Sequence, residues 1–388
     1  MSPIRLGFVG LSTGGWAART LAQPLFEEPL SSQYTITAVS TTNPTSANAS
    51  AENYGKLVNG TVKAYHGTTE HIANDPDVDM VAISVRASAH ADAALPALQA
   101  KKDLFIEWPA GNQLAGTTQI AEAARKAGVR TLVGLQTRQA AYIRKIKEIL
   151  DSGILGRILS SSLVSTLTLL YLPATHKTYT QIVSFCYPGA RGPTSWEWFK
   201  YTSDPSNGAT MLDVDGGHLI DLLHYLFGPI SSITAQLANQ YPMLQPTDNI
   251  TGEPVGEPEP SNDVHQIHFG GQFANKDATV LSVNIRNVLS EHGAGLFWVI
   301  DGEKGAIKMS ADGILKGQSI MRAQPEVWLN GEKVDVVTDT ETERCAKNWK
   351  RYAEGVEGEY ATMEDALQAK KVVDAIFKSS REGRRIDL

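Results

Sequence analysis

The first third of the chain alternates short apolar runs with helix-like patterns. The apolar runs predict strands at Ile4–Val9, Tyr34–Ser40, Met80–Val85, Leu104–Glu107 and Arg130–Leu135. Helical spacing predicts helices at Gly14–Phe26, His90–Ala100, Thr117–Ala127 and Tyr142–Leu150. Strands that alternate with helices indicate βαβ units, and strands that are apolar on both faces belong in a sheet covered on both sides. This part therefore predicts an α/β Rossmann fold with a doubly wound parallel sheet.

The pattern changes after Gly156, where strands follow one another with few helices between them. Strands are predicted at Ile158–Leu172, Ile233–Leu237, Asp263–Phe273, Ala278–Asn287, Leu296–Asp301, Ala306–Met309 and Glu326–Leu329. Helices are expected at Met211–Phe227 and Met363–Ser380, and the Pro- and Gly-rich stretch Pro242–Pro260 is expected to be an exposed loop. Successive strands without crossover helices predict an α+β domain with a large, mainly antiparallel open sheet.

The length of 388 residues and this change of pattern favour two domains. We expect residues 1–135 to form the domain that contains the parallel sheet. Residues 136–360 are expected to form the substrate and dimerisation domain. One face of its antiparallel sheet should be free of helices, and a second copy would cover such an apolar face in a two-fold homodimer.

Composition and charge argue against several classes of function. The net charge of −7 and a pI near 5.8 argue against partners such as nucleic acid or anionic membranes, which require a basic surface. The apolar runs are far shorter than the about 20 residues of a membrane span, and no secretory signal pattern is visible. Cys186 and Cys345 form no CxxC pair, and His265 and His268 would face opposite sides of a strand. We therefore expect no metal site and a cytoplasmic protein.

The turn after the first strand carries the clearest candidate chemistry. A dinucleotide-binding turn reads G-x-G-x-x-G, because glycine allows a tight turn, a close approach to the pyrophosphate and close packing of the next helix. The chain supplies Gly10, Ser12 and Gly15 at these places, followed by Trp16, so one glycine is a serine. The position of the turn in a βαβ series favours cofactor binding over a generic glycine-rich turn.

The end of the second strand bears on the choice of cofactor. It reads Val39-Ser40-Thr41-Thr42-Asn43, without the acidic residue that usually holds the ribose 2′-hydroxyl of NAD. Hydroxyl groups such as those of Ser40 and Thr41 can donate to a 2′-phosphate, and no carboxylate repels it. The sequence therefore favours NADP(H) over NAD(H), with a Ser/Thr-rich turn of no special function as the alternative.

Further motifs resemble the Gfo/Idh/MocA oxidoreductase family in order and spacing. They are Val85–His90, Phe105-Ile106-Glu107-Trp108-Pro109, Leu135-Gln136-Thr137-Arg138, Gly216–Asp221 and the closing segment Ala366–Leu388. The resemblance spans nearly the whole chain and implies a nicotinamide cofactor. It also implies that residues 1–135 form an NAD(P)-binding Rossmann domain, completed by a C-terminal helix at about 361–388. The glycine loop with its tryptophan, the Glu-Trp pair and the Gly-His pair are most similar to the fungal galactose-pathway repressor branch, which binds NADP and acts through protein contacts.

Two departures from the family pattern affect the catalytic site. The family lysine that assists proton transfer is Trp108 here, and the family aspartate four residues before the histidine is Val214. Asp213 and Asp215 flank that place, and His218 remains. A carbonyl reduction still needs a proton donor near the developing alkoxide, so His218 is the candidate acid.

The resemblance and the residue patterns together nominate site residues. Cofactor-binding candidates are Gly10, Ser12, Gly15, Trp16, Ser40, Thr41, Arg86, His90, Glu107, Trp108, Pro109 and Gln136. Substrate-binding candidates are Trp108, Arg138, Trp198 and Tyr201. Several of them have structural alternatives: Trp16 can simply pack, His90 can cap a helix, Arg138 can form an ion pair, and the aromatic residues near 198 can be core.

Two classes of function follow from these patterns. The first is an NADP(H)-dependent oxidoreductase that acts on a small or medium organic carbonyl, imine or alcohol. The second is a catalytically silent NADP-binding transcriptional regulator with a regulatory protein partner, which would also be found in the nucleus. The replaced lysine and aspartate favour the regulator, whereas the compact length favours the enzyme. A non-redox enzyme that keeps its cofactor as a structural part is a third reading.

Overall fold

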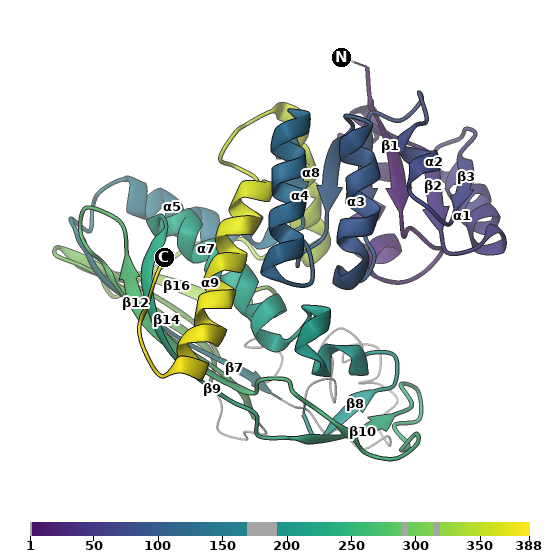
Figure 1. Ribbon diagram of the computed structural model, residues 1–388. Coiled ribbons are helices and arrows are strands. Elements are labelled where there is room, and N and C mark those ends of the chain that lie inside the picture. The colour runs from purple at the N-terminus through teal and green to yellow at the C-terminus, as the bar shows by residue number, and fades with distance from the viewer. Residues whose placement is uncertain (1, 169–191, 289–293, 313–318) are drawn as a thin grey trace. The chain divides into compact units, whose positions relative to one another are not determined.

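The computed structural model describes residues 2–168, 192–288, 294–312 and 319–388, and the chain divides into two compact units (Figure 1). Unit 1 comprises Met1–Ala140 and Asp339–Gln368, and unit 2 comprises Ala141–Thr338 and Ala369–Leu388. The end of the predicted strand Ile158–Leu172 lies outside the described residues, as does Cys186. Within the described ranges, no helix is long and apolar enough to cross a membrane.

Unit 1 is built on a six-stranded sheet in the order β3-β2-β1-β4-β5-β6, and each neighbouring pair is parallel. The strands are β1 (Ile4–Val9), β2 (Tyr34–Thr41), β3 (Lys63–His66), β4 (Met80–Ile83), β5 (Asp103–Ile106) and β6 (Thr131–Val133). Strands added outward on both sides of the central β1–β4 pair make the doubly wound α/β sheet that the sequence predicts, and this prediction is confirmed.

Helices and short turns connect these strands. The helices of unit 1 are α1 (Pro44–Leu57), α2 (Glu70–Ala73), α3 (His90–Gln99), α4 (Leu114–Ala127) and α8 (Glu341–Glu354). The turns are η1 (Ala17–Leu21), η2 (Gln23–Phe26), η3 (Leu30–Ser32), η4 (Ala87–Ala89) and η5 (Gln136–Gln139). Figure 1 shows α3 and α4 side by side, and the two helices contact each other.

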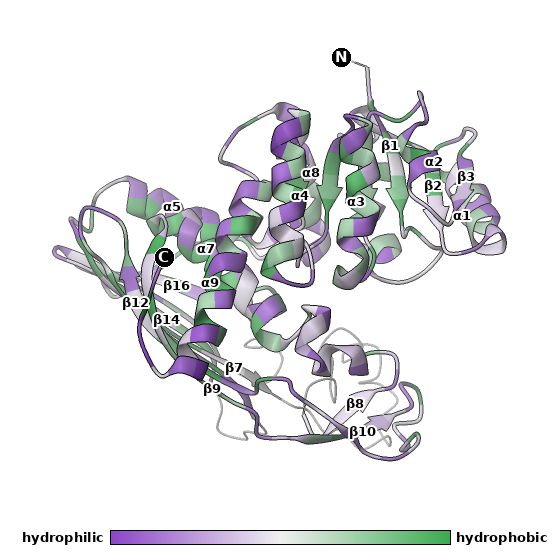
Figure 2. Cartoon of the chain, in the orientation of Figure 1, coloured by the Kyte–Doolittle hydropathy of each residue, from purple (hydrophilic) through white to green (hydrophobic). Residues whose placement is uncertain are grey.

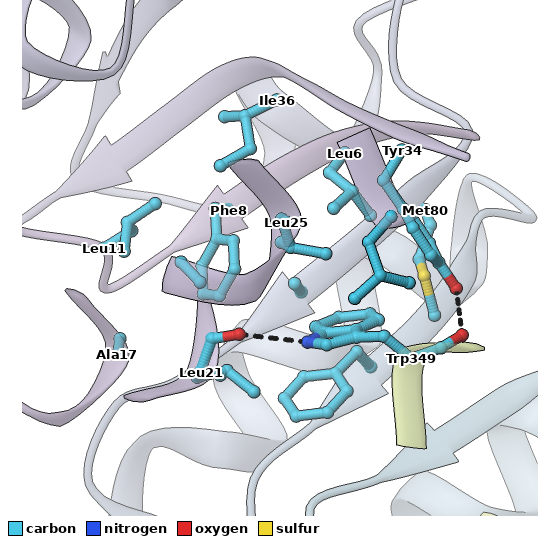
Figure 3. Close-up of a cluster of buried hydrophobic side chains, with 14 of the residues drawn as sticks. Leu6, Phe8, Leu11, Ala17, Leu21, Leu25, Tyr34, Ile36, Met80 and Trp349 are labelled. Carbon is cyan, nitrogen blue, oxygen red and sulfur yellow. Dashed lines mark hydrogen bonds between the residues drawn. The ribbon is translucent and has the colours of Figure 1, made fainter. Parts of the chain in front are cut away.

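A large core cluster of unit 1 joins the first strands to α8 (Figure 3). Trp349 of α8 stacks on Phe105 with ring centroids 4.6 Å apart. Its indole N–H donates to the Leu21 carbonyl at 3.1 Å, and the Tyr34 hydroxyl donates to the Trp349 carbonyl at 2.7 Å. These bonds satisfy polar groups that would be costly to bury unpaired. A helix late in the chain is thereby part of the N-terminal core.

Two features of unit 1 differ from the sequence predictions. The helix predicted at Gly14–Phe26 is wrong as a continuous element, because the segment forms a π-turn at η1 and a 3-10 turn at η2. Pro24 explains the break, since it lacks an N–H and its ring clashes with the carbonyl four residues earlier. The pattern also misses α1, β3 and α8; in α8 the buried apolar stripe is only Cys345, Trp349 and Tyr352.

Unit 2 contains a nine-stranded sheet in the order β17-β16-β15-β14-β7-β13-β12-β9-β18. Its neighbouring strands pair antiparallel except β7 with β13, which confirms the mainly antiparallel sheet. The strands are β7 (Ile158–Thr168), β9 (Ile230–Ala238), β12 (Gln266–Phe273), β13 (Val280–Val288), β14 (Ala294–Gly302), β15 (Gly305–Asp312), β16 (Glu326–Leu329), β17 (Glu332–Val334) and β18 (Ile386–Asp387). A second sheet has the order β11-β10-β8, with β8 (Thr194–Trp196), β10 (Met243–Thr247) and β11 (Glu259–Pro260).

The large sheet has two unlike faces. In Figure 1, α5 (Ala141–Asp151), α7 (Gly217–Phe227) and the final part of α9 (Met363–Glu382) lie along one face of it. Leu163 and Trp298 are buried, whereas their strand neighbours Val164 and Phe297 are 39% and 42% exposed. Val164 and Phe297 are register partners in β7 and β14. An exposed apolar pair therefore lies in the middle of the sheet. Figure 2 shows that α9 carries both hydrophobic and hydrophilic residues.

Unit 2 corrects two further predictions. The helix predicted at Met211–Phe227 divides into a π-turn, η8 (Leu212–Gly216), and α7. The predicted exposed loop Pro242–Pro260 is exposed over residues 249–258, but the stretch also contains β10 and β11 and buries Leu244. The Pro- and Gly-rich composition does not reveal these strands, because β10 pairs with β8, which is distant in the sequence.

The two units also divide the C-terminal segment differently from the predicted boundaries. Residues 339–368 belong to unit 1 and residues 369–388 to unit 2. Trp349 in the unit 1 core explains the first assignment. The Ser379 hydroxyl explains the second, since it accepts from the backbone N–H of Ala235 in β9 at 3.0 Å.

Candidate functional site

The chain makes a tight turn at the carboxyl end of β1. Gly10 has a φ of +87°, and a Cβ at this position would lie 2.2 Å from the carbonyl oxygen of Ser84, just after β4. The Gly10 N–H donates to the Ser40 carbonyl at 2.8 Å. The turn is thus held between the ends of β2 and β4, and its conformation requires glycine.

The loop that follows is exposed and internally fixed. The Ser12 hydroxyl donates to the Gly14 carbonyl at 2.6 Å, and the Ser12 carbonyl accepts from the Tyr54 hydroxyl of α1 at 2.8 Å. Gly15 has a φ of +91°, and a Cβ added at Gly14 or Gly15 meets nothing within 4 Å. Open space over a fixed glycine backbone fits a pyrophosphate, which must approach the peptide N–H groups closely.

Glu107, directly after β5, is tied to this loop. Its carboxylate accepts a hydrogen bond from the Trp16 indole N–H at 2.9 Å. A Cβ at Gly134 would lie 2.3 Å from Glu107 Oε2, so the carboxylate occupies the space that a side chain would fill. Burial raises the pKa of Glu107 to about 7, opposed by the hydrogen bonds from Trp16 and the backbone N–H of Trp108. The loop is therefore anchored through an acid that titrates near neutral pH.

His90 joins two loops at the same end of the sheet. Its Nδ1 lies 2.8 Å from the Pro109 carbonyl oxygen and its Nε2 lies 3.1 Å from the Val85 carbonyl oxygen. Burial lowers the pKa of His90 to about 4, against the opposing effect of the two carbonyls. A neutral imidazole has one N–H, so it donates to one of the two carbonyls at a time. His90 thus connects the segments after β4 and β5, including the cis peptide bond between Trp108 and Pro109.

The end of β2 meets the start of α1. Ser40 is buried, and the hydroxyls of Thr41 and Ser46 lie 2.7 Å apart. Asn43 caps α1 by accepting from the Ser46 N–H at 2.9 Å. Because α1 was not predicted, the sequence gives no sign that a helix N-terminus lies here, with a partial positive charge beside the hydroxyl groups.

Other candidates of unit 1 lie in different surroundings. Arg138 is buried in η5 and forms an ion pair with Asp365 at 3.0 Å, which lowers the pKa of Asp365 against its desolvation. This is the structural alternative for Arg138, and a substrate role stays a prediction. Gln136 in η5 and Trp108 are buried, while Arg86 is exposed just before η4.

His218 lies in unit 2, in the first turn of α7. Its side chain is 5% exposed. Burial, and secondly the positive charge of Arg322, lower the pKa of His218 to about 3. The imidazole is therefore neutral at physiological pH, where it can donate one hydrogen bond but carries no additional proton.

Asp213 is bound within unit 2. Its Oδ1 lies 2.5 Å from Lys370 Nζ, and its Oδ2 accepts from the Thr210 hydroxyl at 2.6 Å. Both charged side chains are buried, so removing one partner would leave an uncompensated charge at a cost of about 3–5 kcal/mol. The ion pair joins η8 to α9 and thereby fixes the turn that leads to His218.

Trp198 and Tyr201 belong to an aromatic row in unit 2. Trp196 stacks on Trp198 with centroids 5.7 Å apart, and Phe199 lies 5.2 Å from Trp198 and 5.8 Å from Tyr201. Phe199 is buried, while Trp198 is 47% exposed. The row joins a core residue to an exposed ring, and a substrate-binding role for Trp198 and Tyr201 stays a prediction.

The structure gathers many of the nominated residues at one sheet end. The carboxyl ends of β1, β2, β4 and β5 carry Gly10, Ser12, Gly15, Trp16, Ser40, Thr41, Arg86, His90, Glu107, Trp108 and Pro109. Trp198, Tyr201 and His218 belong to unit 2. Sequence reasoning missed Tyr54 and Gly134, because each acts through a contact with a residue more than 25 positions away, and it missed Arg322, whose positive charge lowers the pKa of His218.

Comparison with known families divides the chain in the same place. Residues 4–135 match the model of the Gfo/Idh/MocA family, described as an oxidoreductase family with an NAD-binding Rossmann fold. Residues 141–311 match the model of the Gal80p C-terminal domain.

Individual relatives include both enzymes and regulators. The dehydrogenase aclE of Aspergillus oryzae is 30% identical over 98% of this chain and 97% of its own length. The galactose/lactose metabolism regulatory protein GAL80 of Saccharomyces cerevisiae is 28% identical over 80% of this chain and 67% of its own length. A super-repressor mutant of Gal80p from the same yeast has a TM-score of 0.80 at 24% identity, covering 100% of this chain and 98% of its own. A levoglucosan dehydrogenase in complex with NADH and L-sorbose reaches 0.73 at 19% identity, covering 100% and 99%.

Proposed function

The chain belongs to the Gfo/Idh/MocA oxidoreductase family, and from this premise we propose that it transfers a hydride between NADP(H) and a small or medium organic carbonyl, imine or alcohol. The observation that carries the proposal is the exposed glycine loop, with Gly10 pressed against Ser84 and open space over Gly14 and Gly15. Similarity to a dehydrogenase over nearly the full length of both chains supports hydride transfer in addition to cofactor binding.

The residues of unit 1 would hold the cofactor at the end of the sheet. The backbone of Ser12–Gly15 would bind the pyrophosphate, and Trp16, fixed by Glu107, would cover it. When bound, the nicotinamide supplies or accepts the hydride, and the protein supplies orientation and electrostatics. Trp108 and Pro109, positioned through His90, would border the nicotinamide.

The preference for NADP(H) rests on the end of β2. Residues 40–43 carry hydroxyl and amide groups and no carboxylate, and the N-terminus of α1 lies at the same place. A 2′-phosphate there would gain donors and the favourable helix dipole, whereas a 2′-hydroxyl would lack its usual acidic acceptor.

Calorimetric titration with NADPH and NADH tests this part. We expect tighter binding of NADPH by about 10- to 100-fold, the range of one or two hydrogen bonds to a charged group. Gly15→Ala should weaken the binding of both NADPH and NADH, because its added Cβ enters the open space that the ligand needs. Gly128→Ala is the matched control: it has a φ of +68° and open space too, but lies at the end of α4. Tighter binding of NADH would contradict the preference.

His218 is the residue proposed to act on the reacting oxygen or nitrogen. Because it is neutral in the free protein, its N–H can stabilise the charge that develops on that atom as hydride reaches the carbon. Screening carbonyls, imines and alcohols for oxidation of NADPH or reduction of NADP⁺ tests the enzymatic function directly. Turnover of at least one class is expected.

A second function is favoured by specific observations. The family lysine is Trp108, Asp213 is bound to Lys370, and the C-terminal domain model that matches is that of Gal80p. These support a regulator that binds NADP and contacts another protein. A complete lack of turnover across the screen, together with tight NADPH binding, would decide for the regulator. Cytoplasmic location stays a prediction under either function.

We also propose a homodimer built on the open face of the large sheet. The exposed Val164 and Phe297 lie side by side on that face, and Val280 is exposed on β13. Covering such apolar residues with a second copy would remove them from water.

A further inference from the structure

The carboxyl ends of β2 and β3 lie next to each other at the edge of the unit 1 sheet (Figure 1). The two strands are parallel, and Thr41, the last residue of β2, is the register partner of His66, the last residue of β3. The Gly67 N–H donates to the Thr41 carbonyl at 3.4 Å, which continues the contact beyond the last pair. Thr41 and His66 are therefore neighbours at the end of the sheet where the proposed cofactor site lies.

The His66 side chain lies on the same face of the sheet as that of Thr41. Register partners on adjacent strands share a face, because side chains alternate along each strand with the same period. Helix α1 begins over this face, since the Thr41 hydroxyl lies 2.7 Å from the Ser46 hydroxyl. His66 is exposed, and its side chain forms no hydrogen bond or ion pair within the described ranges. Its imidazole is thus accessible to a ligand at the end of β2.

The other basic residue of β3 is already bound. Lys63 donates to the carboxylates of Asp75 and Asp77, each at 2.7 Å. The Tyr65 hydroxyl also donates to Asp75, at 3.1 Å. Lys63 and Tyr65 alternate with His66, so these contacts lie on the opposite face of the strand. His66 is therefore the basic side chain that the strand pairing places beside Thr41.

We propose that His66 binds the 2′-phosphate of NADP(H) and thereby determines the preference of this chain for NADP(H) over NAD(H). The inference rests on the proposed function, in which the end of β2 meets the adenosine ribose, as it does in Rossmann folds. Neighbouring strands are about 4.8 Å apart, so a phosphate that contacts Thr41 is within reach of an imidazole on the next strand. An imidazolium donates a charge-assisted hydrogen bond to a phosphate oxygen, which a hydroxyl group cannot match.

This assignment separates the two cofactors by charge. The 2′-phosphate carries about two negative charges, whereas NAD(H) has a neutral hydroxyl at the same position. A positive charge beside Thr41 therefore favours NADP(H) and contributes little to the binding of NAD(H). The residues that follow β2 include no lysine or arginine before Lys56, and the register of β3 supplies the basic group instead.

Calorimetric titration of the full chain with NADPH and NADH tests the role of His66. We expect His66→Ala to weaken the binding of NADPH at least about 10-fold, as for the loss of a hydrogen bond to a charged group, and to leave the affinity for NADH unchanged. His66→Arg should retain the preference for NADPH, because it keeps a positive charge at this place. His71→Ala is the matched control, since His71 is an exposed histidine of the same unit, on α2.

NMR of the histidine side chains tests the contact without the nicotinamide. The His66 resonance is identified by its loss in His66→Ala, and the parent is then titrated with adenosine 2′,5′-bisphosphate or with adenosine 5′-monophosphate. We expect the bisphosphate to shift the His66 resonance saturably, and to shift it further than the monophosphate does. The His71 resonance, identified in the same way, should stay in place.

The possible results separate this inference from the proposed function. A preference for NADPH that is undiminished in His66→Ala, or a His66 resonance that does not move at saturating bisphosphate, overturns the role of His66 and leaves the preference for NADP(H) standing. Equal affinity of the parent for NADPH and NADH overturns both. Neither measurement depends on turnover, so the role of His66 is tested independently of hydride transfer.

Discussion

The Glu107 carboxylate lies between the indole N–H of Trp16 and the space left open by Gly134. Glu107 stands out in the sequence, but its proximity to Gly134 does not, because Gly134 is only a glycine that follows a short strand. The same holds for His218: the motif identifies the histidine, while the charge that acts on it comes from Arg322, about 100 positions later. Single residues with family motifs were therefore predictable, and their electrostatic surroundings were not.

The raised pKa of Glu107 predicts a pH-dependent stability. The folded state binds the proton with a pKa of about 7 and the unfolded state near 4.5, so the folded state carries more protons between these values. The free energy of unfolding should then fall as pH rises from about 4.5 to 7, by about 3 kcal/mol from this group. Glu107→Gln keeps an oxygen for Trp16 and should lose this pH dependence.

Urea unfolding at pH 5 and pH 8 measures the effect as the difference between parent and variant. Glu52→Gln is the control, since Glu52 is exposed on α1 and pairs only with Lys56 in the described structure. An equal change of stability with pH in the parent and in Glu107→Gln would show that the carboxyl of Glu107 is solvated.

The elements divide into those with a simple period and those without one. The central strands β1 and β4 are buried apolar runs, and α3, α4 and α9 have wide apolar faces, so the sequence pattern predicts them. The π-turns η1 and η8 were expected to be α-helix, because a π-turn has no distinctive composition. The sequence pattern does not predict helix α8, because its main buried residue, Trp349, packs against residues from the start of the chain.

The open face of the nine-stranded sheet predicts the oligomeric state. We expect light scattering at micromolar concentration to give twice the chain mass. Phe297→Glu should give a monomer, because a carboxylate in the centre of the covered face would be desolvated without a partner. Ile250→Glu is a suitable control, since Ile250 is exposed in a turn outside the large sheet. A monomeric parent protein, or a dimer that tolerates Phe297→Glu, would refute the interface.

At the scale of the whole molecule, the chain passes from unit 1 to unit 2, back to unit 1 and again to unit 2. The sequence predicts two domains, with a C-terminal helix that packs on the first of them. In the structure, the chain rejoins unit 1 earlier than predicted, at α8. The residues proposed to bind the cofactor are in unit 1, whereas His218, Arg322 and the Asp213–Lys370 pair are in unit 2. Substitutions of these unit 2 residues should therefore change the rate of the reaction and leave the affinity for the cofactor unchanged.

This separation makes His218→Ala the most direct test of the central claim, that the chain is an NADP(H)-dependent oxidoreductase whose chemistry depends on His218. The measurement is the rate of deuterium transfer from NADPH labelled at the reactive carbon to the best substrate of the screen, in the parent and in the variant. The account predicts that the transfer falls about 100- to 10,000-fold, the usual contribution of a side chain positioned at the reacting atom, while NADPH affinity stays the same. Absence of deuterium transfer in the parent, or an unchanged rate in His218→Ala, would contradict it.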